Sequence, residues 1–393
     1  MGLSHLTNKS PHIVIIGAGI VGASIAFHLS RRHVNLTIID QEQPWQAQPG
    51  TRASSHSFAW INATIGKEPA SYHDLNRRSV DMWSRFASLL QSDIGLRWGG
   101  ELRWASTEKE ADELRRGVEL QQRRGYACRL LDEATFRLRE PSINPETFMI
   151  GALSVKDGIV EPSQVIQACL RHVQANGGTV SGNTAVTDFV MHGTGRGGRR
   201  IKAIRTTSGR TTSGEIPCDV VVFAAGVGST QLAALVGLNI PQQDSPGGVV
   251  QTDPRPPLFK NIAVLNTPAR NANRPGIHVR QWTDGTVMIG EGSQESRARD
   301  DSQAHADELL TRAMFYLPAL AGARAIPVPV GYRPMPLDEL PILGFTQAVP
   351  NLYIALMHSG VTLAPLVGEL SMIEIVDGIQ VALLDCYRLE RFR

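Results

Sequence analysis

The segment HIVIIGAGIVGASIAFHLS, near the start of the chain, constrains the fold more than any other stretch. The apolar, β-branched run Ile13–Ile16 predicts a buried parallel strand. Gly17, Gly19 and Gly22 follow with the spacing G-x-G-x-x-G. Residues Ala23–Ser30 have the apolar pattern of a helix. Together they predict a strand, a tight glycine turn and a helix that packs closely on the strand.

This unit is typical of a domain that binds a dinucleotide. Gly17 permits the turn, Gly19 lets the backbone approach a pyrophosphate, and Gly22 lets the helix approach the strand. The N-terminus of the helix then directs its N–H groups and its positive dipole end toward the phosphates. A second strand, Leu36–Ile39, ends in Asp40, where a ribose-binding carboxylate is expected, about 20 residues after the glycines. Chance glycines in an ordinary strand–turn–helix are the alternative.

Composition excludes several classes of protein. The chain has 393 residues, 42% of them hydrophobic and 19% charged, which is enough for two globular domains with a large core. A net charge of +2 offers no basic field for nucleic acid. The four cysteines lie far apart, so we expect free thiols and no metal site. The absence of an apolar signal core or of a run long enough to cross a bilayer predicts a cytoplasmic protein.

The pattern of strands and helices changes twice along the chain, which predicts an α/β protein with two interleaved domains. We expect a Rossmann-like nucleotide-binding domain and an α+β substrate domain with an antiparallel sheet. LRWGGELRWAS reads as two antiparallel strands joined by glycines, and Asp284–Gly285 as a hairpin turn. The expected ranges are 1–94, 150–236 and 325–393 for the nucleotide-binding domain, and 95–149 and 237–324 for the substrate domain.

Several segments, in their order, resemble one family. GAGIVGASIAFHLS, ASSHSFAWINA, DGIVEPSQVIQACLRHVQANGGTV, DVVVFAAGVGS, GYRPMPLDELPILGF and HSGVTLAP are similar to segments of the flavin-dependent amine oxidases of the D-amino acid, glycine and sarcosine oxidase type. The resemblance covers nearly the whole chain. Three features depart from it: Asp40 stands where glutamate is usual, His56 stands where arginine or a small residue is common, and PVPVGYRPMPLDE holds no cysteine.

The resemblance implies FAD as cofactor, and the missing cysteine predicts that the flavin is bound without a covalent link. It also implies a cofactor-binding set that surrounds the flavin, with Arg333 at the boundary between cofactor and substrate. The expected cofactor-binding residues are Gly17, Gly19, Ile20, Val21, Gly22, Asp40, Gln41, Ser54, Ser55, His56, Val186, Ala225, Gly226, Arg333, His358, Ser359, Gly360, Val361 and Thr362.

The activity that the resemblance implies is oxidation of a carbon–nitrogen bond in an amino acid or N-substituted amino acid. Hydride passes to the flavin, the imine hydrolyses, and oxygen is reduced to hydrogen peroxide. Arg333 is expected to bind the substrate carboxylate, with Tyr332 and Trp60 as further walls of the catalytic pocket. No histidine is expected to act as a base.

Two other functions are compatible with the sequence: a dehydrogenase with a different electron acceptor, and a non-catalytic FAD-binding assembly protein. A small amino-acid-like substrate and oxygen are the expected partners, without nucleic acid or membrane insertion. Homo-oligomerisation stays open.

Overall fold

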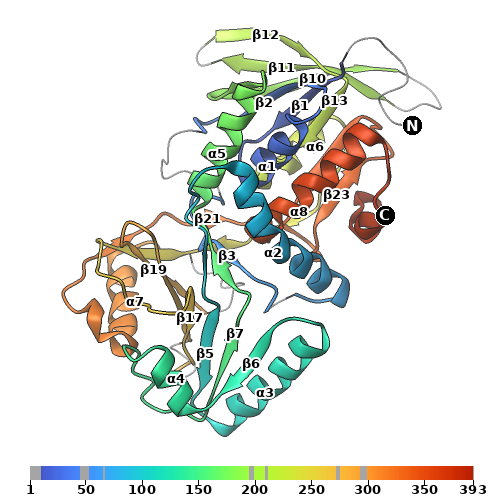
Figure 1. Cartoon of the computed structure of the whole chain (residues 1–393). Coiled ribbons are helices and arrows are strands. Elements are labelled where there is room, and N and C mark those ends of the chain that lie inside the picture. The colour runs from blue at the N-terminus through green and yellow to red at the C-terminus, as the bar shows by residue number, and fades with distance from the viewer. Residues whose placement is uncertain are drawn as a thin grey trace.

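A six-stranded sheet, formed by segments that lie far apart in the sequence, carries the glycine turn (Figure 1). The computed structural model describes residues 10–44, 53–64, 67–193, 199–208, 211–270, 275–292 and 299–392. Every neighbouring pair in the sheet is parallel except β23 with β24. In spatial order the strands are β23 (Ile342–Phe345), β24 (Leu352–Leu356), β13 (Val220–Phe223), β1 (His12–Ile16), β2 (Asn35–Ile39) and β9 (Thr179–Ser181).

Both faces of this sheet are buried, which explains the uninterrupted apolar run of β1. Ile13 and Ile15 pack into the core on the helical side, and Val14 and Ile16 into the core on the other side. The helices of the first side are α1 (Ile20–Leu29), α2 (Ala70–Leu90), α5 (Pro162–Ala175) and α8 (Gly360–Met372). The other side is covered by α6 (Ser229–Leu235) and a sheet of β10 (Thr184–His192), β11 (Arg200–Ser208) and β12 (Thr211–Pro217).

Three backbone segments meet at the glycine turn with no space for side chains. A Cβ atom on Gly22 would lie 1.9 Å from the carbonyl oxygen of Gly17. Gly17 has φ +106°, and a Cβ there would lie 2.4 Å from the carbonyl oxygen of Ala224, just after β13. The expected reason for glycine at these two positions is therefore confirmed: helix, turn and neighbouring strand touch through their backbones.

An eight-stranded sheet forms the lower half of the molecule in Figure 1. Its pairs are antiparallel except β17 with β5. Helices α3 (Glu108–Arg123), α4 (Glu133–Arg139) and α7 (Gln303–Tyr316) belong to this half. In spatial order the strands are β20 (Ala325–Pro327), β16 (Val249–Thr252), β19 (Val287–Glu291), β18 (Ile277–Gln281), β17 (Val264–Asn266), β5 (Glu101–Ala105), β7 (Ile150–Ser154) and β6 (Cys128–Leu131).

The expected fold class is confirmed: a parallel Rossmann-like sheet is combined with a mostly antiparallel second sheet. Two details differ. Strands β7 and β20 belong to the second sheet, so the expected domain limits at 150 and 325 cut through it, and we propose limits just after these two strands. The expected hairpin in LRWGGELRWAS is wrong, because β4 (Arg97–Trp98) pairs with β8 and β5 with β7. The hairpin at Asp284–Gly285 is confirmed.

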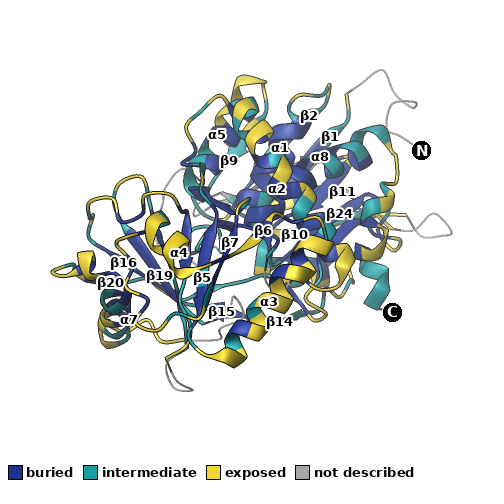
Figure 2. Ribbon diagram, turned by 60° about the horizontal axis from the view of Figure 1, so that its bottom comes forward, coloured by how far each residue is buried: buried dark blue, intermediate teal, exposed yellow. Residues whose placement is uncertain are grey.

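Three small sheets complete the described strands. β3 (Trp60–Ile61) and β4 pair on either side of β8 (Gly158–Ile159), β14 (Gln242–Gln243) pairs with β22 (Met335–Pro336), and β15 (Pro246–Gly247) pairs with β21 (Gly331–Tyr332). Strands β3 and β21 lie between the two large sheets (Figure 1). Figure 2 shows the two large sheets as mainly buried, whereas α3 exposes a continuous polar face.

We expect Gly22→Ala to destabilise the protein by roughly 3 kcal/mol, because the added methyl group overlaps a backbone oxygen that cannot move freely. Gly117→Ala is the matched control, since it lies within α3, is exposed, and would place its Cβ where no described atom comes within 4 Å. That change is expected to stabilise the protein by about 0.5–1 kcal/mol. Denaturant unfolding measures both. Equal stability of Gly22→Ala and the parent would contradict the packing argument.

Candidate active site

A cavity of about 770 Å³ opens at the carboxyl ends of the parallel strands. The segments that follow β1, β2, β13 and β24 all line it, through residues such as Gly17, Asp40, Ala225 and His358. In open parallel sheets this edge is the ordinary place for a ligand. The volume is in the range of cofactor and substrate sites.

The carboxylate of Asp40 is held at the edge of this cavity by backbone groups. Its Oδ2 accepts a hydrogen bond of 2.7 Å from the N–H of Ala18, and its Oδ1 one of 2.9 Å from the N–H of Glu42. Ser54 approaches the glycine turn from the following loop, and its Oγ accepts a bond of 3.2 Å from the N–H of Ile20. The turn, the acid and the loop after β2 therefore form one polar end of the cavity.

Nearly all the residues expected to bind cofactor or substrate line this one cavity. Gly22 does not, because it faces the turn, and Ser55 is absent from the lining. The residues that do line it are Gly17, Gly19, Ile20, Val21, Asp40, Gln41, Ser54, His56, Trp60, Val186, Ala225, Gly226, Tyr332, Arg333, His358, Ser359, Gly360, Val361 and Thr362. Their roles as ligands stay predictions.

The N-terminus of α8 forms a second polar end, where Ser359 is the N-cap. The Ser359 hydroxyl accepts a hydrogen bond of 2.6 Å from Lys67 Nζ and one of 2.8 Å from the hydroxyl of Tyr72. Lys67 is buried and lines the cavity, although nothing in the sequence singled it out. The positive helix end and the ammonium group thus make this part of the cavity electropositive.

Helix α2 fixes the position of this helix end. The carbonyl oxygen of Thr362 accepts bonds from Ser79 Oγ at 2.7 Å and from Trp83 Nε1 at 3.1 Å. The Thr362 hydroxyl donates to the carbonyl of Trp60 at 3.2 Å. The first turn of α8 is consequently tied both to α2 and to β3.

Arg333 directly follows β21 and lines the cavity beside β15, where a glycine makes room for its side chain. Its Nη1 donates a bond of 2.7 Å to the carbonyl of Pro246. A Cβ on Gly247 would lie 2.3 Å from Nη2 and 2.5 Å from Cζ of the guanidinium group, so the group lies directly on the Gly247 backbone. Gly248, next in the chain, has more room, because a Cβ there would lie 3.9 Å from the nearest described atom.

Two cavity histidines are uncharged near neutral pH. Burial lowers the pKa of His278, a hydrogen bond with the Gly292 backbone opposes this and the charge of Arg333 adds to it, and the pKa lies at about 4 as a result. Burial lowers the pKa of His358 to about 3, with Lys67 and Arg333 acting in the same direction. Positive charge in this part of the cavity therefore comes from Lys67 and Arg333, and neither of these two histidines adds to it.

Trp60 lines the cavity with its indole held in place from behind. Its Nε1 donates a bond of 2.8 Å to Asp157 Oδ2, which also accepts one of 2.7 Å from Thr64, while Asp157 Oδ1 accepts one of 2.6 Å from Tyr126. The indole N–H is thus committed to Asp157, and Trp60 offers the cavity an apolar ring.

Sequence reasoning missed several residues of the cavity wall. Lys67 follows a polar loop with no recognisable signal, and His278 lies in a strand whose partners the sequence does not reveal. Gly247 carries no sequence signal of its contact with Arg333, because that contact depends on the long-range pairing of β15 with β21. Glu291 and Phe58 also line the cavity.

Comparison with known proteins identifies the family. The family model described as DAO, FAD dependent oxidoreductase, matches residues 12–371. The chain belongs to this family. The family members act as FAD-dependent oxidoreductases on CH–NH or CH–NH₂ groups, so the expected enzyme class and the resemblance to glycine and sarcosine oxidases are confirmed.

Individual relatives differ in what their names describe. One of the subunits of opine oxidase from Agrobacterium tumefaciens (strain Ach5) is 28% identical over 367 residues, covering 90% of each chain. Glycine oxidase of Geobacillus kaustophilus (strain HTA426) is 26% identical over 367 residues, covering 91% of each. The crystal structure of L-proline dehydrogenase from P. horikoshii is similar in fold, with a TM-score of 0.80, 20% identity and coverage of 98% of both chains.

Two further expectations concern the chain as a whole. All four cysteines carry free thiols, with Cys386 exposed and the other three buried. None of the four lines the cavity. Among the residues described, no helix is both long and apolar enough to cross a bilayer.

The depressed histidine pKa values predict how stability depends on pH. An unfolded chain keeps its histidines near 6.5, so it binds more protons than the folded protein as pH falls from 6.5 toward 4. Stability is therefore lost over this window. We expect His278→Gln to reduce that loss by about 1 kcal/mol, a value discounted for the part of the ring that faces the cavity. Urea unfolding at pH 6.5 and pH 4.5 measures the difference. An identical loss in the parent and the variant would contradict the assignment.

Proposed function

We propose that this protein is an FAD-dependent oxidase of an amino acid or N-substituted amino acid, similar to glycine oxidase. The substrate's carbon–nitrogen bond is oxidised, the resulting imine hydrolyses, and oxygen takes the electrons to give hydrogen peroxide. The observation that carries this proposal is the position of Arg333, a planar cation on the wall of the cavity that begins at the glycine turn. The names of the opine and glycine oxidase relatives support both substrate classes.

The cavity fits FAD at both of its polar ends. Gly17 and Gly19 leave the backbone of the turn open to a pyrophosphate, and Asp40 is placed to accept a bond from a ribose hydroxyl. The first turn of α8, with Lys67 beside it, favours negative charge at the other end. When bound, FAD supplies the hydride acceptor. The residues of this chain supply position and charge.

Arg333 is suited to bind a carboxylate next to the reacting carbon. Its guanidinium group pairs with a carboxylate through two parallel hydrogen bonds, which fixes both distance and orientation. One N–H of the group is held by the carbonyl of Pro246, and the Gly247 backbone supports one face. The group is therefore oriented before a substrate arrives, which lowers the entropic cost of positioning the substrate.

No side chain is needed as a general base if the amine arrives neutral. The depressed pKa of His278 and of His358 leaves two uncharged rings in the cavity, which do not repel a positively charged amine strongly and do not compete for the carboxylate. A rate that rises with the deprotonated fraction of the substrate amine is expected. Other features of the proposal, namely oxygen as acceptor and a cytoplasmic location, rest on sequence reasoning.

We expect Arg333→Ala to lower kcat/KM for the carboxylated substrate at least ~100-fold, because a desolvated charged contact is worth roughly 3 kcal/mol. Arg333→Lys keeps the charge but loses the planar fork, so it should restore only part of the loss. An amine panel with peroxide detection identifies the substrate, and steady-state kinetics then compare the variants. FAD content should not change. Oxidation of the substrate by Arg333→Ala at the parent's rate would place the carboxylate elsewhere.

A matched pair of glycine variants tests the same group without changing it. A methyl group on Gly247 overlaps the guanidinium carbon and nitrogens, so Gly247→Ala should displace Arg333 and raise KM. Gly248→Ala adds the same methyl group where the nearest atom is 3.9 Å away, and its effect should be much smaller. Equal kinetics for the two variants would mean that the position of Arg333 is unimportant. Bleaching of the flavin without formation of peroxide would instead favour a dehydrogenase. The absence of both bleaching and peroxide would favour a non-catalytic assembly protein.

We expect the flavin to be released by acid precipitation, with the yellow colour in the supernatant. No cysteine lines the cavity, and the stretch around Arg333 contains none, so no thiol lies where it could form a thioether link to the flavin. Absorbance of the two fractions measures the distribution. Colour that stays in the pellet would contradict this expectation and would direct attention to His56, His278 and His358, the histidines of the cavity wall.

A further inference from the structure

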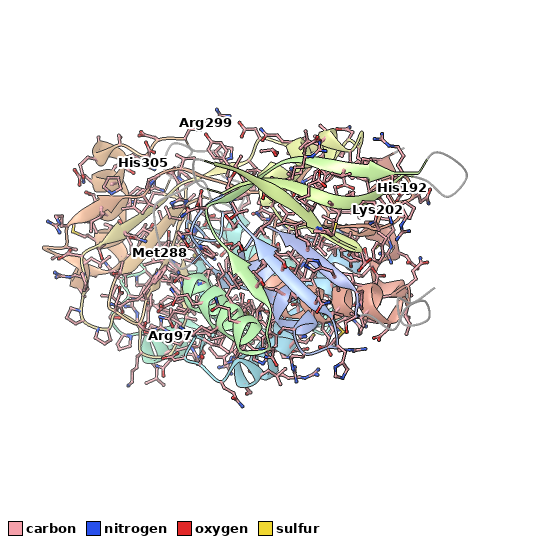
Figure 3. All side chains as sticks on the ribbon, turned by 90° about the horizontal axis from the view of Figure 1, so that it is seen from above. Arg97, His192, Lys202, Met288, Arg299 and His305 are labelled. Atoms are coloured by element: carbon pink, nitrogen blue, oxygen red, sulfur yellow. The ribbon has the colours of Figure 1, made fainter. Side chains whose placement is uncertain are left out.

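A second, much smaller cavity lies behind the wall of the first one. The centre of a water-sized sphere can move through about 10 Å³ of it, so the cavity has room for one species somewhat larger than a water molecule. Arg97 of β4, Arg280 of β18, Trp282 and Glu161 contribute to its lining. Met288 contacts Arg280 and therefore marks its position. In Figure 3, Arg97 and Met288 lie on the side of the molecule that holds the eight-stranded sheet, and Lys202 of β11 lies on the other side.

Arg280 is a cation without any exposed surface, and one of its donors lacks an acceptor. Its Nη1 donates to the carbonyl of Val160 at 3.2 Å, and its Nη2 to the sulfur of Met288 at 3.1 Å. Its Nε has no acceptor among the residues described. The guanidinium carbon lies 4.7 Å from the ring centre of Trp282 and 5.7 Å from that of Phe58. The aromatic rings provide contact but not a counter-charge.

Three further buried donors belong to residues of the same cavity. They are Nε and Nη2 of Arg97 and Nε1 of Trp282, and none has an acceptor within the described part of the chain. A buried N–H group without an acceptor costs about 1–3 kcal/mol, and more when the group is charged. Four such donors at one small cavity indicate that an acceptor belongs there.

The charges of the lining are not balanced. Two cations and one carboxylate, that of Glu161, face this cavity. Glu161 Oε1 accepts bonds from the N–H of Thr283 at 3.2 Å and from its hydroxyl at 2.5 Å, and Oε2 accepts one from Gln164. Glu140 also attracts Arg97, but it lies outside the lining, and its oxygens accept backbone N–H groups of Lys260 and Asn261.

Burial and the neighbouring cation both disfavour the charge of Arg280. Burial lowers the pKa of Arg280, Glu161 opposes this and the charge of Arg97 adds to it, and the pKa lies at about 9 as a result. Burial likewise lowers the pKa of Arg97. A water molecule accepts two hydrogen bonds and would leave two of the four donors unpaired. A spherical anion accepts all four and compensates the excess charge.

We propose that Arg97, Arg280 and Trp282 form a binding site for one small monovalent anion of the size of chloride or bromide. The site joins β4 and β8 to the end of β18, the strand that also carries His278. Arg280 in turn contacts the ring of Phe58, which lines the larger cavity. The bound anion therefore supports the wall of the active site without taking part in the reaction, and the proposal does not depend on the identity of the substrate.

Bromide tests the site in the FAD-loaded protein. Melting temperatures are measured in sodium gluconate and in mixtures of gluconate and bromide at constant ionic strength. A rise of roughly 5 °C is expected, which keeps growing with the logarithm of the bromide concentration once that exceeds Kd, because a ligand that binds only the folded state stabilises it in this way. Crystals soaked in sodium bromide should show an anomalous peak between the two guanidinium groups and the Trp282 indole.

Two arginine variants separate this site from a general salt effect. Arg97→Gln should fold, because Arg97 lies at the partly exposed edge of the cavity, and it should lose the bromide-dependent rise. Arg115→Gln removes an exposed arginine of α3, paired with Asp112 at 2.8 Å, and should retain the rise. A rise of equal size in Arg97→Gln would overturn the proposal. Electron density at this position without an anomalous signal in the bromide-soaked crystals would also overturn the proposal, because it would show that water occupies the cavity.

Discussion

The direct backbone contact of α1 with the turn after β1 is the constraint on which the rest of the structure depends. Gly22 lies so close to Gly17 that no side chain fits between them, and Gly17 in turn touches Ala224 after β13. The N-terminus of α1 is thereby held at the carboxyl edge of the sheet, beside Asp40. Gly368 of α8 lets that helix approach α1 closely in the same way, since a Cβ on Gly368 would lie 2.4 Å from Ser24 Oγ of α1. This close approach brings α8, and with it the His358–Thr362 segment, to the same cavity.

Local sequence signals sufficed for the parts of the fold that local geometry determines. The glycine turn, the apolar strands β1 and β2, and the helix α1 between them are predicted from short patterns, because each pattern reflects a contact within a few residues or full burial of a strand. The family resemblance added Arg333 and the His358–Gly360 loop to the candidate site.

The errors arose where pairing is decided over long distances. Residues 150–154 and 325–327 are short strands with no sign of which sheet they join, and the partners β5 and β16 lie far away in the sequence. LRWGGELRWAS alternates like a hairpin, yet Gly99 and Gly100 direct the chain from one sheet into another, with φ +157° and +87°. Lys67 was missed for the same reason: its partner Ser359 is almost 300 residues away.

The long-range contacts that bring Lys67 and Arg333 to the cavity also determine its electrostatics. Lys67 and Arg333 lie far apart in the sequence, and the field of each adds to the effect of burial in lowering the pKa of His358. In the proposed function, the two fixed cations and the uncharged imidazoles select against simple amines, since an amine without a carboxylate brings one more positive charge and no partner for Arg333. A carboxylate on the substrate reverses that balance. In the proposed function Arg333 thus both binds such a substrate and accounts for its selection, Lys67 adds to the positive field, and neither cation has to transfer a proton for the chemistry to proceed.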